Sequence, residues 1–150
     1  MAALQRLMTE LNDLQANPQP FVSVNTHQGD YYEWLGNLNG PEGTAFEGGL
    51  FEFLIKFSKK YPSKPPKVYF QTPIFHPNIF PSNGRVCHSL LNHMWNPNCH
   101  PRVIIDYLIE LLNRPEPEHG FMCEAADICL ISREEWFNIA RERTFRDAFG

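Results

Sequence analysis

The sequence predicts one α+β domain in which helices and strands occupy separate parts of the chain. Four short runs of aromatic and β-branched residues follow one another between residues 21 and 72, and helical patterns lie on either side of them. This segregation is typical of an antiparallel sheet packed against helices and differs from the alternation of a doubly wound sheet. A chain of 150 residues is long enough for about one domain, so we assign 1–150 to a single domain.

An N-terminal helix is predicted from apolar residues at helical spacing, and it ends near 17–18, where Pro follows Asn. Its apolar stripe consists of Leu4, Leu7, Met8, Leu11 and Leu14. We expect this stripe to pack on the strands that follow.

Four strands are predicted from the aromatic and β-branched runs, which Gly, Pro and Asn separate. The runs are FVSV (21–24), YYEWLGNL (31–38), GLFEFLIKF (49–57) and KVYFQT (67–72). Because consecutive strands are joined locally, we expect an antiparallel meander.

The segment 72–100 follows neither a helical nor an alternating pattern, and its prolines and the Asn83-Gly84 pair indicate irregular structure. Long loops in compact domains are usually functional or disordered. This one is too apolar for disorder, so we expect an ordered functional loop. Its apolar residues are Phe75, Ile79, Val86, Leu90, Leu91 and Trp95.

Three helices are predicted after this loop. The first begins at Pro101, which suits a first helical turn, and ends before Pro115; the second covers about 121–130. Ser132 and Glu135 match an S-x-x-E capping box that opens the third.

Composition narrows the class of protein. The formal net charge of -4 argues against a nucleic-acid binder, which would carry a basic excess. No apolar run approaches the roughly 20 residues that span a bilayer, and the first residues lack the pattern of a secretory signal. We therefore expect a cytoplasmic or nuclear protein without a membrane partner, whose four cysteines are reduced thiols.

Cys87 permits three interpretations. It could be a small buried hydrophobe, as most free cysteines are. It could bind zinc, although the spacing of the candidate ligands does not match the usual short Cys and His pairs. It could be a nucleophile, because Gly84 permits a sharp turn just before the thiol and the Asn78 amide could donate to an oxyanion. The candidate zinc ligands are Cys87, His88, His93, Cys99 and His100.

Several motifs, taken in order, resemble the ubiquitin-conjugating enzyme family over nearly the whole chain. They are GPEGTAFEGGLFEFLIKF (40–57), YPSKPPKVYF (61–70), HPNI (76–79), GRVC (84–87), the tryptophan at 95, and LLNRPEPEHG (111–120) before EAA. The order of helix, four strands, loop and three helices is also the order of that family's fold.

This resemblance implies that Cys87 accepts ubiquitin from an activating enzyme as a thioester and passes it to a substrate lysine or a ligase. ATP is used upstream, so no cofactor and no metal are expected. Asn78 would stabilise the oxyanion or brace the loop by a hydrogen bond, and the two roles are equally compatible with the residues. His76, Pro77 and Trp95 would be structural residues of the active-site loop.

The chain departs from the family pattern at the catalytic loop. Nine positions separate Asn78 from Cys87, one more than is common, so one residue is inserted around 81–83. The FPS element there is similar to the SUMO-conjugating branch, but that branch is basic and this chain acidic, which favours ubiquitin. His119, with Glu118, stands where many members carry an acidic gate residue, and it is either part of a variant gate or a solvated surface histidine.

The partner surfaces implied by the resemblance are altered as well. Arg6 is the only basic residue in the first ten, so charging by the activating enzyme could be slower or partner-restricted. Asp106 replaces an apolar position against which bound ubiquitin can fold back. The expected ligase-binding residues are Arg6, Ser63, Asn96, Pro97 and Asn98, and Ser23 is the expected backside ubiquitin contact. We expect a monomer; the alternative to an enzyme is a noncatalytic scaffold of the same fold that binds ubiquitin or a partner.

Overall fold

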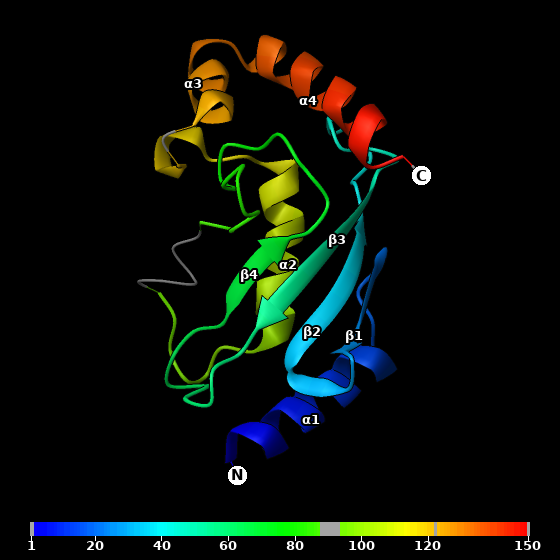
Figure 1. Cartoon of the computed structure of the whole chain (residues 1–150), viewed down its shortest axis with the longest axis vertical. Coiled ribbons are helices and arrows are strands. Elements are labelled where there is room, and N and C mark those ends of the chain that lie inside the picture. Colours follow the sequence, from blue (N-terminus) through cyan, green and yellow to red (C-terminus); the bar gives the residue numbers. More distant parts are fainter. Residues whose placement is uncertain (1, 88–93, 122, 150) are drawn as a thin grey trace.

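The computed structural model describes residues 2–87, 94–121 and 123–149 and confirms the predicted α+β architecture (Figure 1). The elements are α1 (Ala2–Ala16), β1 (Val22–His27), β2 (Asp30–Asn39), β3 (Leu50–Lys56), β4 (Lys67–Phe70), α2 (Pro101–Asn113), the 3₁₀ helix η2 (Pro117–His119), α3 (Glu124–Ile131) and α4 (Arg133–Asp147). None of the helices within the described residues has the length and apolarity needed to cross a bilayer.

The four strands form one antiparallel sheet in the order β1-β2-β3-β4, as the meander predicts. β1 continues three residues beyond the predicted FVSV run, because Asn25 and Thr26 pair with Leu35 and Trp34 of β2. The extension was not predicted, because the prediction followed runs of apolar residues. Asn25 and Thr26 are polar and belong to the strand through their backbone pairing.

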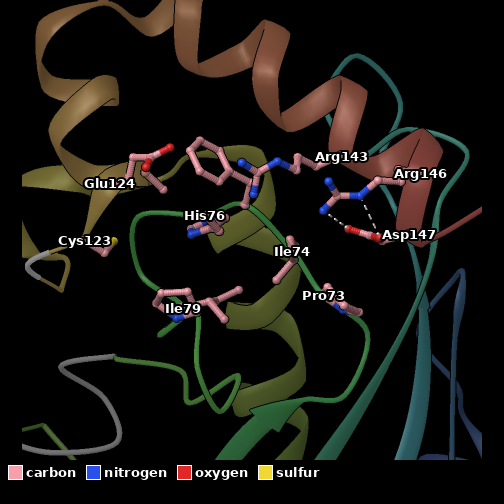
Figure 2. A pocket seen from close by; sticks show the side chains of 12 residues that line it. Pro73, Ile74, His76, Ile79, Cys123, Glu124, Arg143, Arg146 and Asp147 are labelled. Atoms are coloured by element: carbon pink, nitrogen blue, oxygen red, sulfur yellow. Dashed lines mark hydrogen bonds and ion pairs between the residues drawn. The ribbon is translucent and has the colours of Figure 1, made fainter.

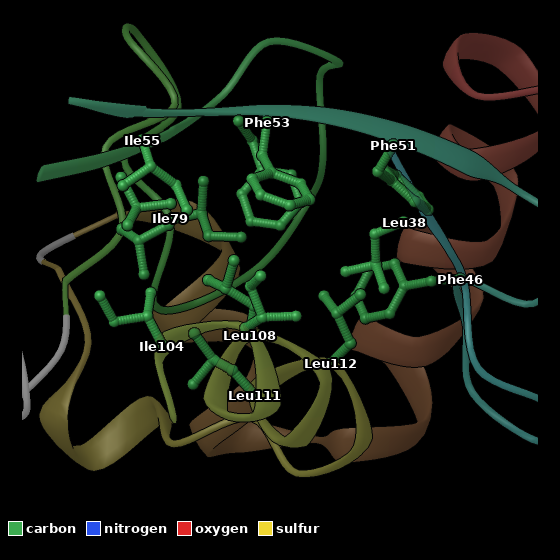
Figure 3. Packing of buried hydrophobic residues seen from close by; sticks show 14 of the residues in the cluster. Leu38, Phe46, Phe51, Phe53, Ile55, Ile79, Ile104, Leu108, Leu111 and Leu112 are labelled. Atoms are coloured by element: carbon green, nitrogen blue, oxygen red, sulfur yellow. The ribbon is translucent and has the colours of Figure 1, made fainter. Parts of the chain in front are cut away.

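The core lies between the sheet and α2. Figure 3 shows side chains of β3 facing those of α2, with Leu38 and Phe46 completing the layer. Burying each large apolar side chain contributes about 1.5–3 kcal/mol, so this layer fixes α2 across the sheet. The contacting residues include Phe51, Phe53 and Ile55 of β3 and Ile104, Leu108, Leu111 and Leu112 of α2.

The apolar stripe of α1 is narrower than predicted. Leu7, Leu11 and Leu14 are buried, but Leu4 and Met8 are 38% and 39% exposed. Among the strands, α1 packs mainly on β1 and β2, at one edge of the sheet, so a single row of side chains is enough to fill the contact.

The predicted cap of α4 is formed in part. The Glu135 amide donates to the Ser132 side chain over 3.1 Å. The reciprocal half of the box is not made, because the Ser132 amide donates instead to the Ile128 carbonyl at the end of α3. Ser132 therefore both ends α3 and begins α4.

Candidate active site

A short hydrogen-bonded ladder places Cys87 beside Asn78. The Cys87 amide donates to the Asn78 carbonyl over 2.8 Å, and Ile79 and Val86 form the next bridge. The Phe80 carbonyl then accepts from the Gly84 amide, which closes a turn over 81–83. The turn can accommodate the longer interval that the resemblance implies, since Asn78 and Cys87 are in direct backbone contact.

Gly84 is required at the end of this turn. Its φ of +75° lies in the left-handed region. Its carbonyl accepts from the Phe70 amide over 2.7 Å, and a Cβ at this position would lie 1.9 Å from the Phe70 carbonyl oxygen. The turn is therefore packed tightly onto β4.

Asn78 is buried, and its side chain joins the loop to the segment before η2. Its Nδ2 donates to the Glu116 carbonyl over 2.8 Å, and its Oδ1 accepts from the Glu116 amide over 2.8 Å. Both polar atoms of the amide are used in this pair, which is the arrangement of a loop brace.

His76 is buried and joins the same loop to α2. Its Nδ1 accepts from the Asn78 amide over 3.0 Å, so its Nε2 carries the proton and donates to the Leu111 carbonyl over 2.8 Å. Burial lowers the pKa of His76 to about 4, so the imidazole is neutral at physiological pH. The next residue, Pro77, accepts from the Phe121 amide through its carbonyl.

A cavity of ≈ 280 Å³ lies behind the loop, between residues 73–81 on one side and α3 and α4 on the other (Figure 2). The Arg143 guanidinium lies 4.8 Å from the centre of the Phe75 ring at its wall. The Trp136 indole donates to the Phe75 carbonyl over 3.2 Å, so the loop is anchored to α4 as well as to α2.

Cys87 itself is half-buried, and its Sγ lies 4.0 Å from the His119 carbonyl oxygen. Glu118 and His119 both belong to η2 and are exposed. The Glu116 carboxylate accepts from the Tyr107 hydroxyl over 3.1 Å. Of the sequence-predicted site residues, Cys87 and Asn78 are therefore brought together, with the backbone of His119 beside the thiol. Glu118 is the preceding residue of η2, and its charge acts on Cys129 of α3.

The residues predicted to bind a ligase also converge. Arg6 donates to the Cys99 carbonyl over 2.9 Å and lies 5.4 Å from the centre of the Tyr61 ring. The Trp95 indole donates to the Pro62 carbonyl over 2.7 Å. These contacts place α1, the loop of Ser63 and the segment 96–98 on one surface.

Glu10 connects that surface and was missed from the sequence. Its carboxylate accepts from the Tyr61 hydroxyl over 2.7 Å, from Arg6 over 3.2 Å and from His100 over 2.9 Å. Burial, followed by the bond to Glu10, raises the pKa of Tyr61 far above its usual range. The i,i+4 spacing of Arg6 and Glu10 could have indicated their ion pair. It could not have indicated that Tyr61 and His100 also bond to Glu10.

Ser23 and Asp106, the two positions considered for further ubiquitin contacts, lie on β1 and α2. Ser23 is exposed on β1, opposite Asn37 of β2. Asp106 is exposed on α2 and accepts from the Gln19 side chain over 3.0 Å.

The zinc interpretation rests partly on His88 and His93, which lie outside the described residues. Among the residues that are described, no group of three or more His, Cys, Asp and Glu side chains could hold a metal ion.

The loop around Cys87 is fixed by buried hydrogen bonds, while the thiol remains reachable from solvent. A thiol in this setting suits a transferase that carries an acyl group on cysteine.

Comparisons with known proteins identify the family. The ubiquitin-conjugating enzyme family profile matches residues 6–144. A probable ubiquitin-conjugating enzyme E2 31 of Arabidopsis thaliana is 35% identical over 146 residues, which cover 97% of this chain and 94% of the relative. The solved E2 domain of a Toxoplasma gondii ubiquitin-conjugating enzyme superposes with a TM-score of 0.87 at 33% identity, covering 96% of this chain and 97% of the other.

The chain belongs to the ubiquitin-conjugating enzyme family, and both the resemblance and the fold read from the sequence are confirmed. It is a transferase that carries ubiquitin as a thioester, and its family generally interacts with ubiquitin, activating enzymes and ligases. The scaffold alternative is not favoured.

Proposed function

We propose that Cys87 is the residue that carries the modifier. The observation that supports this assignment most is the half-buried thiol at the end of the ladder from Asn78, against the His119 carbonyl. In charging, the Cys87 thiolate attacks the thioester carbonyl on the activating enzyme, a new C–S bond forms, and the activating enzyme's cysteine leaves as a thiolate. In discharge, a lysine amine attacks the new thioester, loses a proton, and Cys87 leaves.

Asn78 acts mainly as the brace of this loop, since its Oδ1 and Nδ2 are both bonded to the Glu116 backbone. His76, Pro77 and Trp95 are structural residues that fix the loop to α2, to Phe121 and to the Pro62 segment. In this assignment, the residues that fix the loop determine the position of the thioester.

Glu118 and His119 form the variant gate for the incoming lysine. An amine with an ordinary pKa of ~10.4 is almost wholly protonated at pH 7, so a nearby acceptor favours its approach and its deprotonation. A neutral imidazole or a carboxylate supplies that acceptor, whereas a charged imidazole repels the ammonium.

The ligase-binding surface comprises Arg6, Ser63, Asn96, Pro97 and Asn98. With Ser63 in its loop, this surface is more polar than it would be with a large apolar residue at that position. Ser23 is the contact for a second, noncovalent ubiquitin.

Ubiquitin is the favoured modifier because the chain is acidic, with a formal net charge of -4. We place the enzyme in the cytoplasm or nucleus, as a monomer of one domain without a cofactor or metal of its own, since ATP is used by the activating enzyme.

A charging assay tests the proposal. The enzyme is mixed with activating enzyme and ATP, and with ubiquitin or SUMO in parallel, and the products are resolved with and without reductant. We expect a reductant-sensitive ubiquitin adduct that the Cys87→Ala variant does not form. An adduct that persists in this variant, or one formed only with SUMO, would contradict the assignment of the residue or of the modifier, respectively.

A further inference from the structure

A groove on the face formed by the β2–β3 connection and the start of β1 is not used by the proposed function. It has a volume of ≈ 530 Å³, which lies within the range of ligand-binding pockets. Its walls include Pro20, Phe21, Pro41, Gly48 and Ile109. In Figure 1 the β2–β3 connection lies beside the C-terminal end of α4, whereas α3, which follows the η2 turn at Cys87, lies at the other end of α4.

Phe21 is placed at the groove by a costly backbone conformation. Its φ of 65° is in the left-handed region, which aromatic residues rarely adopt. The Asn39 amide donates to its carbonyl over 3.0 Å, so the backbone is fixed while the ring remains 75% exposed. Such conformations persist only where the surroundings impose them, and they cluster at binding sites.

The apolar surface continues from the groove onto α4. A Cβ at Gly48 would lie 2.8 Å from the Phe149 ring, and that ring lies 4.6 Å from the ring of Phe145. Phe145 and Phe149 are 51% and 43% exposed. Several large apolar side chains are thus gathered on one face, which marks an interaction site more often than scattered exposed residues do.

The charged side chains that line the groove are acidic. The charged residues that line it, Glu42 and Glu47, are both exposed glutamates, and neither forms an ion pair within the described part of the chain. Arg141, the neighbouring cation, is bonded to the Ala45 and Glu47 carbonyls. All five lysines lie between residues 56 and 67, at the other end of β3.

We propose that this groove binds a peptide segment of a partner protein in which a bulky apolar side chain is flanked by lysine or arginine. The apolar side chain would enter the groove beside Phe21, and the basic side chain would reach Glu42 and Glu47. Because the groove is remote from Cys87, the partner could be bound while the enzyme is charged and discharged.

The test is a selection of phage-displayed random 12-residue peptides on the intact enzyme, with the Phe21→Gly variant used to remove peptides that bind elsewhere. Glycine adopts a positive φ without strain, so this variant removes the ring and keeps the backbone. Phe137→Ser, an exposed aromatic of α4 that does not line the groove, is the matched control.

We expect enriched peptides that combine a bulky apolar residue with lysine or arginine. Their affinity for the enzyme, measured by fluorescence anisotropy, should be at least tenfold lower for Phe21→Gly than for the wild type and unchanged for Phe137→Ser. The affinity for the wild type should fall when salt is added, and the affinity for Glu42→Lys should be lower than for the wild type. Amide chemical shifts should change at residues 20–21, 40–42 and 47–49.

Three results would overturn the proposal: no enrichment over Phe21→Gly, enriched peptides without basic residues, or concentration-dependent dimers in sedimentation that Phe21→Gly abolishes. The last would assign the groove to a second copy of the chain. Charging at Cys87 should be unchanged in all three variants, so a failure here leaves the proposed function standing.

Discussion

The two sides of the Cys87 thiol are built differently. On one side, Asn78 and His76 are buried, and the hydrogen bonds that their side chains make within the described residues go to the backbone of another segment or of the loop itself. On the other side, Glu118 and His119 are exposed on a 3₁₀ helix of three residues. We propose that the first side sets the position of the thioester and that the second meets the incoming amine.

This difference shows which positions can vary. A buried polar side chain that loses its partner costs about 1–3 kcal/mol, so the loop residues are constrained by stability. Exposed substitutions usually change stability by less than about 0.5 kcal/mol. We therefore expect that either an acid or a histidine at position 119 is compatible with the fold.

The largest effect on the fixed side is expected from Gly84→Ala. A Cβ there meets the Phe70 carbonyl oxygen, and an alanine at positive φ is itself strained by about 1–2 kcal/mol. We expect a loss of at least about 2 kcal/mol in the free energy of unfolding, measured by urea titration. An unchanged stability would show that the turn is not tightly packed onto β4.

Asn78→Ala should have the next largest effect, because it leaves the Glu116 amide and carbonyl without their partner. We expect a loss of about 2–4 kcal/mol in stability, with charging and lysine discharge reduced together. The measurement is chemical unfolding alongside single-turnover discharge of the preformed thioester. A discharge rate reduced by about 10²–10³-fold at unchanged stability would instead assign Asn78 to the oxyanion.

The depressed pKa of His76, about 4, predicts a pH-dependent stability. Between about pH 6.5 and 4 the unfolded chain binds a proton at this residue and the folded chain does not. Stability from this group is therefore complete above pH 6.5 and falls as the pH drops, by about 3 kcal/mol in total.

Urea unfolding at a series of pH values measures this effect as the difference between the wild type and His76→Gln, which removes the titrating group. We expect a shallower pH dependence in the variant. Parallel curves for the two proteins would mean that His76 is not the group that titrates.

The smallest effect is expected at the gate. The neutral fraction of a free lysine amine falls about tenfold per pH unit in this range. We expect discharge to fall more steeply than this between about pH 7.5 and 6, because a charged imidazole at the gate would repel the ammonium. His119→Asp should flatten this profile and leave the unfolding temperature unchanged. The pH profile of single-turnover discharge to free lysine is the measurement, and an identical profile in the variant would make His119 a surface residue without a role in discharge.

The sequence predicted the fold well where side-chain patterns decide it. The strand runs and the helix after Pro101 follow apolar patterns, and each was found within a few residues of its predicted bounds. The exposure of Leu4 and Met8 was not predictable, because periodicity shows which residues share a face but not how much of that face a neighbour covers. The η2 helix has no apolar period at all.

For the site, motif resemblance pointed to Cys87, Asn78, Glu118 and His119, and it left open whether Asn78 is a brace or an oxyanion donor. That choice depends on Glu116, whose backbone is 38 positions away in sequence. The contacts of Glu10 with Tyr61 and His100 were hidden for the same reason, since their spacing follows from the fold and not from any local pattern.

If the modifier is carried on the Cys87 sulfur, replacing that sulfur by oxygen must change the chemistry of the bond. Cys87→Ser is incubated with activating enzyme, ATP and ubiquitin, and the adduct is treated with thiol reductant or with hydroxide. We expect an adduct that survives reductant and is cleaved by hydroxide, as an oxygen ester is. An adduct of the variant that thiol reductant still releases would place the modifier on another cysteine and show that Cys87 is not the carrier.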